Sequence, residues 1–132
     1  MTLVIDASAA VEYLLKTSLG GQVRRLLAGA ELAAPELLDV EVVAVLRREV
    51  LRRALTAERA EEAVGDLCLW GIQRLTHRSL LMEAWSLRHN VSAYDALYVA
   101  AARAVGGALV TADGPLSKAS NLGVTVYKAR NV

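Results

Sequence analysis

The sequence is poor in cysteine, aromatic residues and net charge, and each shortage excludes a class of function. Cys68 is the only cysteine, so the chain has no internal disulfide and no zinc site built on several thiolates. A lone thiol is typical of a reduced, cytoplasmic setting. Aromatic residues make up 5% of the chain, too few to predict a surface on which the bases of a single strand stack. The net charge of +1 gives no general attraction for polyanions, so nucleic-acid binding would depend on local basic patches.

Membrane-targeting features are also missing. Residues 1–15 lack a cationic start and contain Asp6, so they do not resemble a signal peptide. Residues 96–112 are nearly all apolar, but Arg103 and the Gly106-Gly107 pair interrupt them. A helix, a turn and a strand explain this run better than a membrane span, and we expect no membrane association.

The chain does contain a regular alternation of apolar segments, in 132 residues of which 55% are hydrophobic, enough for one domain over residues 1–132. We predict strands at residues 2–6, 31–34, 72–75, 108–111 and 124–127. We predict helices at residues 8–15, 20–29, 35–53, 56–71, 78–89, 93–105 and 115–120, with Pro35 in the first turn of its helix. This alternation indicates an α/β fold with a central, mostly parallel sheet of four to five short strands and helices on both faces.

Four acidic residues occupy related places in this pattern. Asp6 ends the first strand, Asp113 lies two residues past the strand at 108–111, and Asp95 begins the helix 93–105. Glu41 lies in a helix that is otherwise mostly apolar. Ligands of parallel sheets bind beyond the carboxyl ends of the strands, and we expect the four carboxylates to meet there.

Each acid also has an ordinary structural explanation. Asp6 and Asp95 suit helix caps, Asp113-Gly114 suits a turn, and Glu41 suits a solvated helix position. Glu41 argues against the ordinary explanation, because an unpaired charge among branched apolar residues is costly and no Lys or Arg lies one turn away.

Converging carboxylates would need a cation. Like charges about 4 Å apart repel by about 4 kcal/mol per pair at an effective dielectric constant of 20, so such a cluster protonates or binds metal. Ligands that offer only oxygen favour Mg²⁺ or Mn²⁺, which in pairs can activate water to attack a phosphodiester.

The same residues carry a resemblance to a known family. The motif Val4-Ile-Asp-Ala-Ser8, Pro35 followed by Glu41, the run Asp95-Ala-Leu-Tyr-Val-Ala-Ala-Ala102, and Thr111-Ala-Asp113 resemble a PIN-domain ribonuclease. The compact size and motif order are most similar to the VapC-type toxins of toxin–antitoxin pairs. The resemblance covers residues 3 to about 127.

The resemblance implies a metal-dependent endoribonuclease that uses Mg²⁺ or Mn²⁺, with RNA as substrate. It implies that Asp6, Glu41, Asp95 and Asp113 are the catalytic, metal-binding acids, and that Ser8 and Thr111 position ligands or water beside them. It also implies a small cognate antitoxin as partner, and a homodimer. Relatives often have Asn where this chain has Ala44, which removes a polar contact to Glu41.

Arg48 and Arg52 lie seven and eleven residues after Glu41, on the same helical face. They are candidates for contact with RNA or with the antitoxin; the alternative is a solvated basic helix end that complements the helix dipole.

Two other functions compete with RNA cleavage. One is a catalytically weak PIN-like scaffold that binds RNA or protein. The other is a phosphoacceptor domain, which fits poorly because Asp6-Ala-Ser8 lacks the second acid that such domains need near the first strand.

Overall fold

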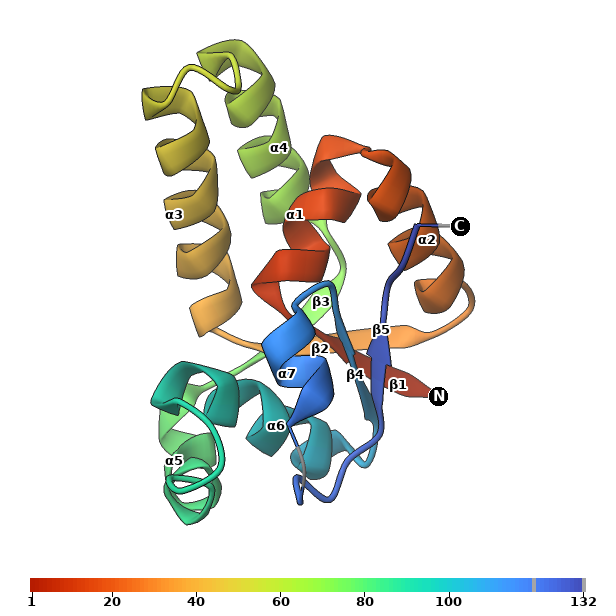
Figure 1. Ribbon diagram of the computed structural model, residues 1–132, viewed down its shortest axis with the longest axis vertical. Coiled ribbons are helices and arrows are strands. Elements are labelled where there is room, and N and C mark those ends of the chain that lie inside the picture. Colours follow the sequence, from red (N-terminus) through yellow and green to blue (C-terminus); the bar gives the residue numbers. More distant parts are fainter. Residues whose placement is uncertain (120, 132) are drawn as a thin grey trace.

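The computed structural model describes residues 1–119 and 121–131, and within them the chain forms a five-stranded parallel sheet with seven helices (Figure 1). The strands are β1 (Thr2–Ile5), β2 (Glu31–Pro35), β3 (Ile72–Leu75), β4 (Ala108–Thr111) and β5 (Val126–Lys128). The helices are α1 (Ala7–Leu15), α2 (Ser18–Leu27), α3 (Leu37–Leu51), α4 (Ala57–Leu69), α5 (His77–Ser86), α6 (Ala93–Val105) and α7 (Gly114–Lys118). The strand order is β3-β2-β1-β4-β5, and every pair is parallel, which confirms the predicted fold class.

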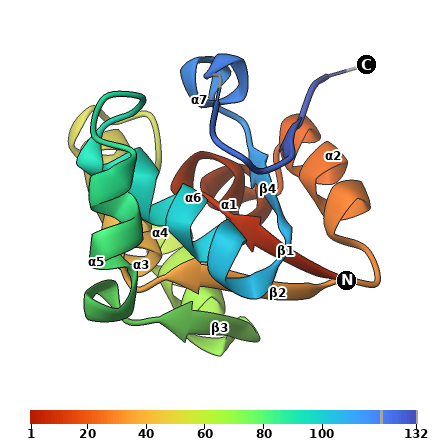
Figure 2. The ribbon, with the colours of Figure 1, turned by 90° about the horizontal axis from the view of Figure 1, so that it is seen from below.

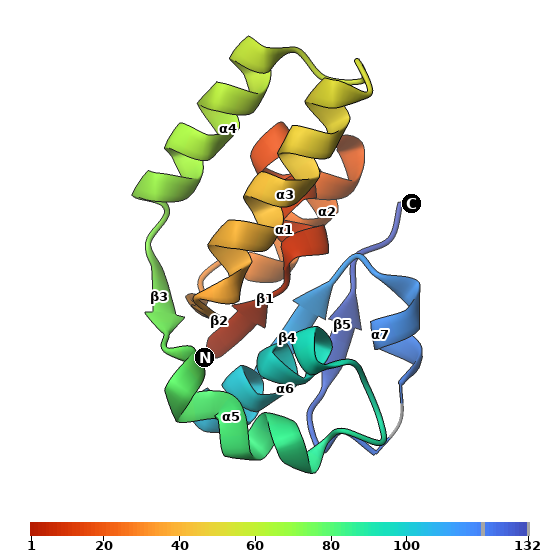
Figure 3. The same ribbon diagram turned by 90° about the vertical axis from the view of Figure 1, so that its left-hand side faces the viewer.

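Helices cover both faces of the sheet. Helices α1 to α4 lie on one side and α5 and α6 on the other, as Figures 1 and 3 agree. Figure 2 looks at the second side, where α6 crosses in front of β1. Helix α7 follows β4 directly and packs against β4 and β5. Within the described ranges, no helix is both long and apolar enough to cross a membrane.

Strand β1 lies at the centre of the sheet and is buried on both faces. Leu3, Val4 and Ile5 are almost fully covered, as expected for branched apolar residues in a parallel sheet. Its neighbour β4 approaches closely at Gly107, where a Cβ atom would lie 2.1 Å from the carbonyl oxygen of Thr2. The carboxyl ends of β1 and β4 therefore lie next to each other, with Ile5 opposite Val110.

Two predicted helix starts are wrong. Pro35 is the last residue of β2, opposite Leu75 of β3, and α3 begins at Leu37. Helix α2 begins at Ser18 rather than Gly20, because the Thr17 hydroxyl accepts the Gly20 N–H at 2.9 Å and starts the helix earlier.

The C-terminal elements are shifted by one or two residues. Helix α7 spans Gly114–Lys118 rather than 115–120, and residue 120 lies outside the described residues. Strand β5 is Val126–Lys128 rather than 124–127, because its register follows β4, with Val110 opposite Tyr127. The structure confirms the helix predicted at 93–105 and the strands predicted at 72–75 and 108–111.

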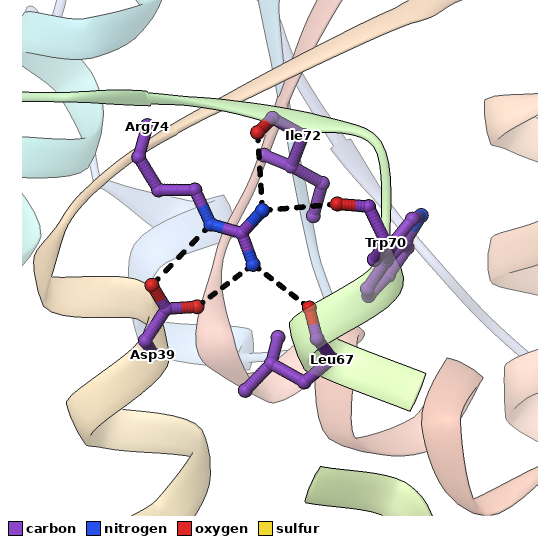
Figure 4. A network of polar contacts seen from close by, with 5 residues as sticks. All are labelled: Asp39, Leu67, Trp70, Ile72 and Arg74. Atoms are coloured by element: carbon purple, nitrogen blue, oxygen red, sulfur yellow. Dashed lines mark hydrogen bonds and ion pairs between the residues drawn. The ribbon is translucent and has the colours of Figure 1, made fainter. Parts of the chain in front are cut away.

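A single arginine joins the start of α3 to the end of α4 (Figure 4). The Arg74 guanidinium binds both carboxylate oxygens of Asp39, at 3.0 and 3.3 Å. It also donates to the carbonyl oxygens of Leu67, Trp70 and Ile72, at 2.9 to 3.1 Å. Because Asp39 lies in the first turn of α3, this cluster fixes the end of the helix that carries Glu41.

Candidate active site

Asp6 lies at the carboxyl end of β1 and caps α1. Its side chain is 5% exposed and accepts hydrogen bonds from the Ser8 hydroxyl at 2.7 Å and the Ala9 N–H at 3.0 Å. The Thr111 hydroxyl donates to its other oxygen. Burial raises the pKa of Asp6 to about 6 despite these donors, and the charge of Asp113 adds to the rise. Asp6 does cap a helix, as its ordinary structural explanation predicts. Capping alone does not explain why its carboxylate is buried where the negative charge is poorly solvated.

Ser8 and Thr111 also position the loop that carries Asp113. The Ser8 hydroxyl accepts the Ala112 N–H, and the Thr111 hydroxyl accepts the Asp113 N–H, both at 2.9 Å. Thr111 is fully buried. The two hydroxyls therefore link the ends of β1 and β4, so that Asp6 and Asp113 keep a fixed relation.

Asp95 and Asp113 approach the cleft from two other elements. Asp95 lies in the first turn of α6, where its N–H donates to the Ser92 hydroxyl at 3.1 Å. Burial, and next the charge of Asp113, raise the pKa of Asp95. Asp113 precedes α7 and makes no side-chain cap there, so its carboxylate is available to the cleft.

Glu41 is held by a residue that the sequence reasoning missed. Its Oε1 accepts the hydroxyl of Tyr98 at 2.6 Å, and Tyr98 is buried in α6. Burial raises the pKa of Tyr98, as do Glu41, Asp6 and Asp95, which places three of the acids around one phenol. The available signal is the spacing, because Tyr98 lies one helical turn after Asp95 and so shares its face.

These residues line one open cleft of about 370 Å³. Its lining consists of Asp6, Ala7, Ser8, Glu41, Asp95, Tyr98, Ala112 and Asp113. The structure thus brings together the four acids singled out in the sequence, with Ser8 among them and Thr111 directly behind Asp6. Within the part of the chain that the structure describes, no Lys or Arg lines the cleft to neutralise them.

The donor set suits a hard divalent cation. It offers carboxylate and hydroxyl oxygens, which Mg²⁺ and Mn²⁺ prefer. Among residues 1–119 and 121–131, no three acidic, His or Cys side chains already stand close enough to hold an ion together. Mg²⁺ commonly takes one or two carboxylates and keeps several waters, so an arrangement without three converging ligands is compatible with it.

Arg48 and Arg52 lie outside the cleft. Both side chains are exposed; Arg48 lies in α3, and Arg52, which caps the end of α3, pairs with Glu49 at 3.5 Å. With a rise of 1.5 Å per residue, they lie about 10 and 16 Å from Glu41 along the helix axis. Their contact with RNA or with an antitoxin stays a prediction.

Comparison with known proteins agrees with this geometry. A family model described as PIN domain matches residues 3–122. The protein named VapC ribonuclease Mb0985, from Mycobacterium bovis, is 42% identical over 115 residues, which cover 87% of this chain and 88% of the relative. Ribonuclease VapC1 from Mycobacterium tuberculosis is 41% identical over 121 residues, covering 90% and 91% of the two chains.

Solved structures show the same fold. A crystal structure of VapBC2 from Rickettsia felis, bound to a DNA fragment from their promoter, matches with a TM-score of 0.71 and 15% identity over 98% of this chain and 100% of that one. The structure of PAE2754 from Pyrobaculum aerophilum matches with a TM-score of 0.64 and 20% identity, over 96% and 83% of the chains. The domain match and the closely similar relatives lead to one conclusion: the chain belongs to the PIN-domain family and groups with the VapC proteins within it.

Proposed function

We propose that the protein is an endoribonuclease, the toxin of a toxin–antitoxin pair, and that its whole chain acts as one nuclease domain in the cytoplasm. The observation that carries the proposal is the cleft, where carboxylates separated by more than 100 residues in sequence surround one space at the carboxyl edge of the sheet. The relatives at 41% and 42% identity are named ribonucleases, which supports RNA as the substrate.

Mg²⁺ or Mn²⁺ is the proposed cofactor, held by Asp6, Glu41, Asp95 and Asp113. Asp6 and Asp95 are the principal ligands in this proposal, because burial disfavours the charge of both and a cation would relieve that cost. When bound, the ion supplies positive charge that stabilises the phosphoryl oxygens and makes water a better nucleophile.

The chain's own residues prepare this chemistry. With its pKa raised to about 6, Asp6 is mostly ionised at neutral pH, and Ser8 and Thr111 hold its carboxylate in place through their hydroxyls. Hydrolysis adds water to phosphorus and breaks one P–O bond, and the departing oxygen takes up a proton. The Thr111 hydroxyl donates to Asp6 and accepts the Asp113 N–H, so the two acids keep a fixed relation in the cleft.

The partners follow from the family and the surface. We propose a small antitoxin as the inhibitor, by analogy with the VapBC2 complex from Rickettsia felis, whose fold this chain shares. A short reading frame immediately upstream that encodes a DNA-binding protein would support it. We also propose a homodimer, consistent with the exposed apolar residues Leu81, Met82 and Trp85 of α5. Light scattering of the purified protein would measure it.

The decisive experiment is RNA cleavage by the purified protein with Mg²⁺, with Mn²⁺ and with a chelator. We expect Asp95→Asn to reduce cleavage at least about 100-fold, since the amide cannot replace the charge of a metal ligand. Asp66→Asn makes the same chemical change on the exposed surface of α4 and should leave the rate unchanged.

Three results would contradict the proposal in different ways. Cleavage that persists in chelator would refute the dependence on a metal ion. Cleavage that persists in Asp95→Asn would refute the assignment of the active site to this cleft. A protein that binds RNA but cuts none, and binds no metal by calorimetry, is the catalytically weak scaffold instead.

A further inference from the structure

Among the described residues that line the cleft, Tyr98 contributes the only aromatic group, beside acids, a serine and alanines. Tyr98 is 2% exposed, so nearly its whole ring is packed in the core, yet its hydroxyl reaches the cleft. Its hydroxyl donates a 2.6 Å hydrogen bond to Glu41, 57 positions earlier in the chain, and so joins α6 to α3. A rigid side chain therefore reaches across the cleft and fixes one of the acids.

Two of the acids, Asp6 and Glu41, therefore accept hydrogen bonds from different hydroxyl groups. Asp6 is held by Ser8 and Thr111, whereas Glu41 is held by Tyr98. Glu41 lies on a helix and is only half-buried, so several rotamers would otherwise be open to its long side chain. A donor that is itself immobile selects one of them before any ligand arrives.

The phenol suits this role better than a charged group would. A tyrosine hydroxyl is neutral and protonated at neutral pH, so it donates to Glu41 without adding charge to the cleft. An Arg or Lys in this place would neutralise Glu41 and compete with a cation, whereas a neutral hydroxyl orients the carboxylate and leaves its charge in place.

We propose that Tyr98 is a positioning residue, which holds the Glu41 carboxylate in the orientation that completes the divalent-cation site and thereby sets the affinity of that site. The inference rests on the proposed function, because it presumes that Glu41 binds metal. Tyr98 acts through Glu41 and need not touch the ion or the RNA.

The test is Mn²⁺ binding by calorimetry to wild type, Tyr98→Phe and Tyr94→Phe. Removing the Tyr98 hydroxyl should weaken Mn²⁺ binding about 10-fold, the lower end of the range for loss of a hydrogen bond to a metal ligand. In RNA cleavage, kcat should fall while KM changes little. Tyr94 lies on the same helix beside Asp95 but is 62% exposed, so Tyr94→Phe controls for loss of one tyrosine hydroxyl and should match wild type.

A double-mutant cycle separates positioning from general loss of stability. If Tyr98 acts through Glu41, the Tyr98→Phe change should alter Mn²⁺ affinity less than about 2-fold when it is made in Glu41→Gln, because the orienting bond no longer serves a charged ligand. An equal loss in both backgrounds would overturn the proposal. So would a folded Tyr98→Phe protein that binds Mn²⁺ as tightly as wild type.

A second measurement keeps Tyr98 intact in case the variant does not fold. The chain has four tyrosines, so 3-fluorotyrosine gives four ¹⁹F signals, and substituting the other three identifies Tyr98. Mg²⁺ should change the ¹⁹F chemical shift of Tyr98 in wild type but not in Glu41→Gln. A chemical shift that does not respond to Mg²⁺ in wild type would refute the coupling between Tyr98 and the cation site. Neither binding measurement needs RNA, so a protein that binds metal but cuts no RNA refutes the proposed function alone.

Discussion

At the scale of single residues, burial makes the negative charge of Asp6 unfavourable in the folded protein. Its folded-state pKa of about 6 is raised above the usual value of 3.8, chiefly by burial. A carboxyl with a raised pKa favours the folded state while it is protonated in both states. That contribution is fully present below about pH 3.8 and is lost as the pH rises through about 6.

We therefore expect the metal-free protein to lose stability between pH 4 and pH 7. The contribution of Asp6 to the free energy of unfolding should fall by up to about 3 kcal/mol, since each pKa unit corresponds to about 1.4 kcal/mol. Urea unfolding in chelator at several pH values measures it. Asp6→Asn should remove most of the slope, and saturating Mg²⁺ should restore stability at pH 7. A metal-free protein that is equally stable at pH 4 and pH 7, or more stable at pH 7, contradicts the assignment.

The sequence predicts which acids matter more readily than it predicts what holds them. Asp6 and Asp113 follow strands that apolar runs identify, and parallel strands end at the same edge, so their proximity follows from the fold class alone. The Tyr98–Glu41 bond depends on how α3 and α6 are rotated relative to each other. That rotation is set by packing against the sheet, which no local pattern encodes.

At the scale of elements, helix and strand types are predicted correctly, but boundaries depend on neighbours that lie far away in sequence. Pro35 suits the first turn of a helix, yet its fixed φ also suits the end of a strand, and pairing with β3 decides the outcome. Gly20 is predicted to begin a helix, yet it lies inside α2, two residues after the helix starts. A side chain there would clash with the carbonyl of Glu12, 2.1 Å away, so glycine allows α1 and α2 to pack closely.

Arg74 is the element-scale counterpart of these contacts, because one guanidinium adds charged donors at a helix end. The carbonyl oxygens of Leu67 and Trp70, at the end of α4, each accept a backbone N–H and also a hydrogen bond from Arg74. Asp39 adds the opposite charge from α3. The cluster therefore ties two helices and a strand through a single side chain.

We expect Arg74→Met to lower the free energy of unfolding by about 1–3 kcal/mol, because Asp39 and three carbonyl oxygens, all in partly buried contacts, lose a charged donor. Arg74→Lys should recover only part of it, because an ammonium cannot serve five acceptors in one plane. Arg78→Met, an exposed arginine of α5, is the matched control and should change little. Chemical denaturation measures all three, and full stability in Arg74→Lys would show that charge alone is what matters.

At the scale of the whole molecule, a nearly neutral protein with an acidic cleft has to bind a polyanion. The net charge of +1 gives no long-range attraction, and the cleft itself repels phosphate until a cation is bound. Binding energy for RNA must therefore come from cations outside the cleft. Arg48 is exposed on α3, the helix that also carries Glu41, and Arg52 is exposed directly after its end, so both lie along one axis that leads away from the cleft.

Replacing both arginines should therefore weaken RNA binding and reduce its dependence on salt. Each phosphate contact contributes about 0.7 to the slope of log affinity against log salt for a single strand, so loss of two contacts in Arg48→Ala/Arg52→Ala should lower the slope by about 1.4. The measurement uses Asp95→Asn as background, so that RNA is bound without being cut. Arg24→Ala/Arg25→Ala removes the same charge from exposed positions on α2 and should leave the slope nearly unchanged. If both pairs lower the slope equally, the protein attracts RNA through its overall charge. If neither pair does, Arg48 and Arg52 lie off the path of the RNA and remain candidates only for contact with the antitoxin.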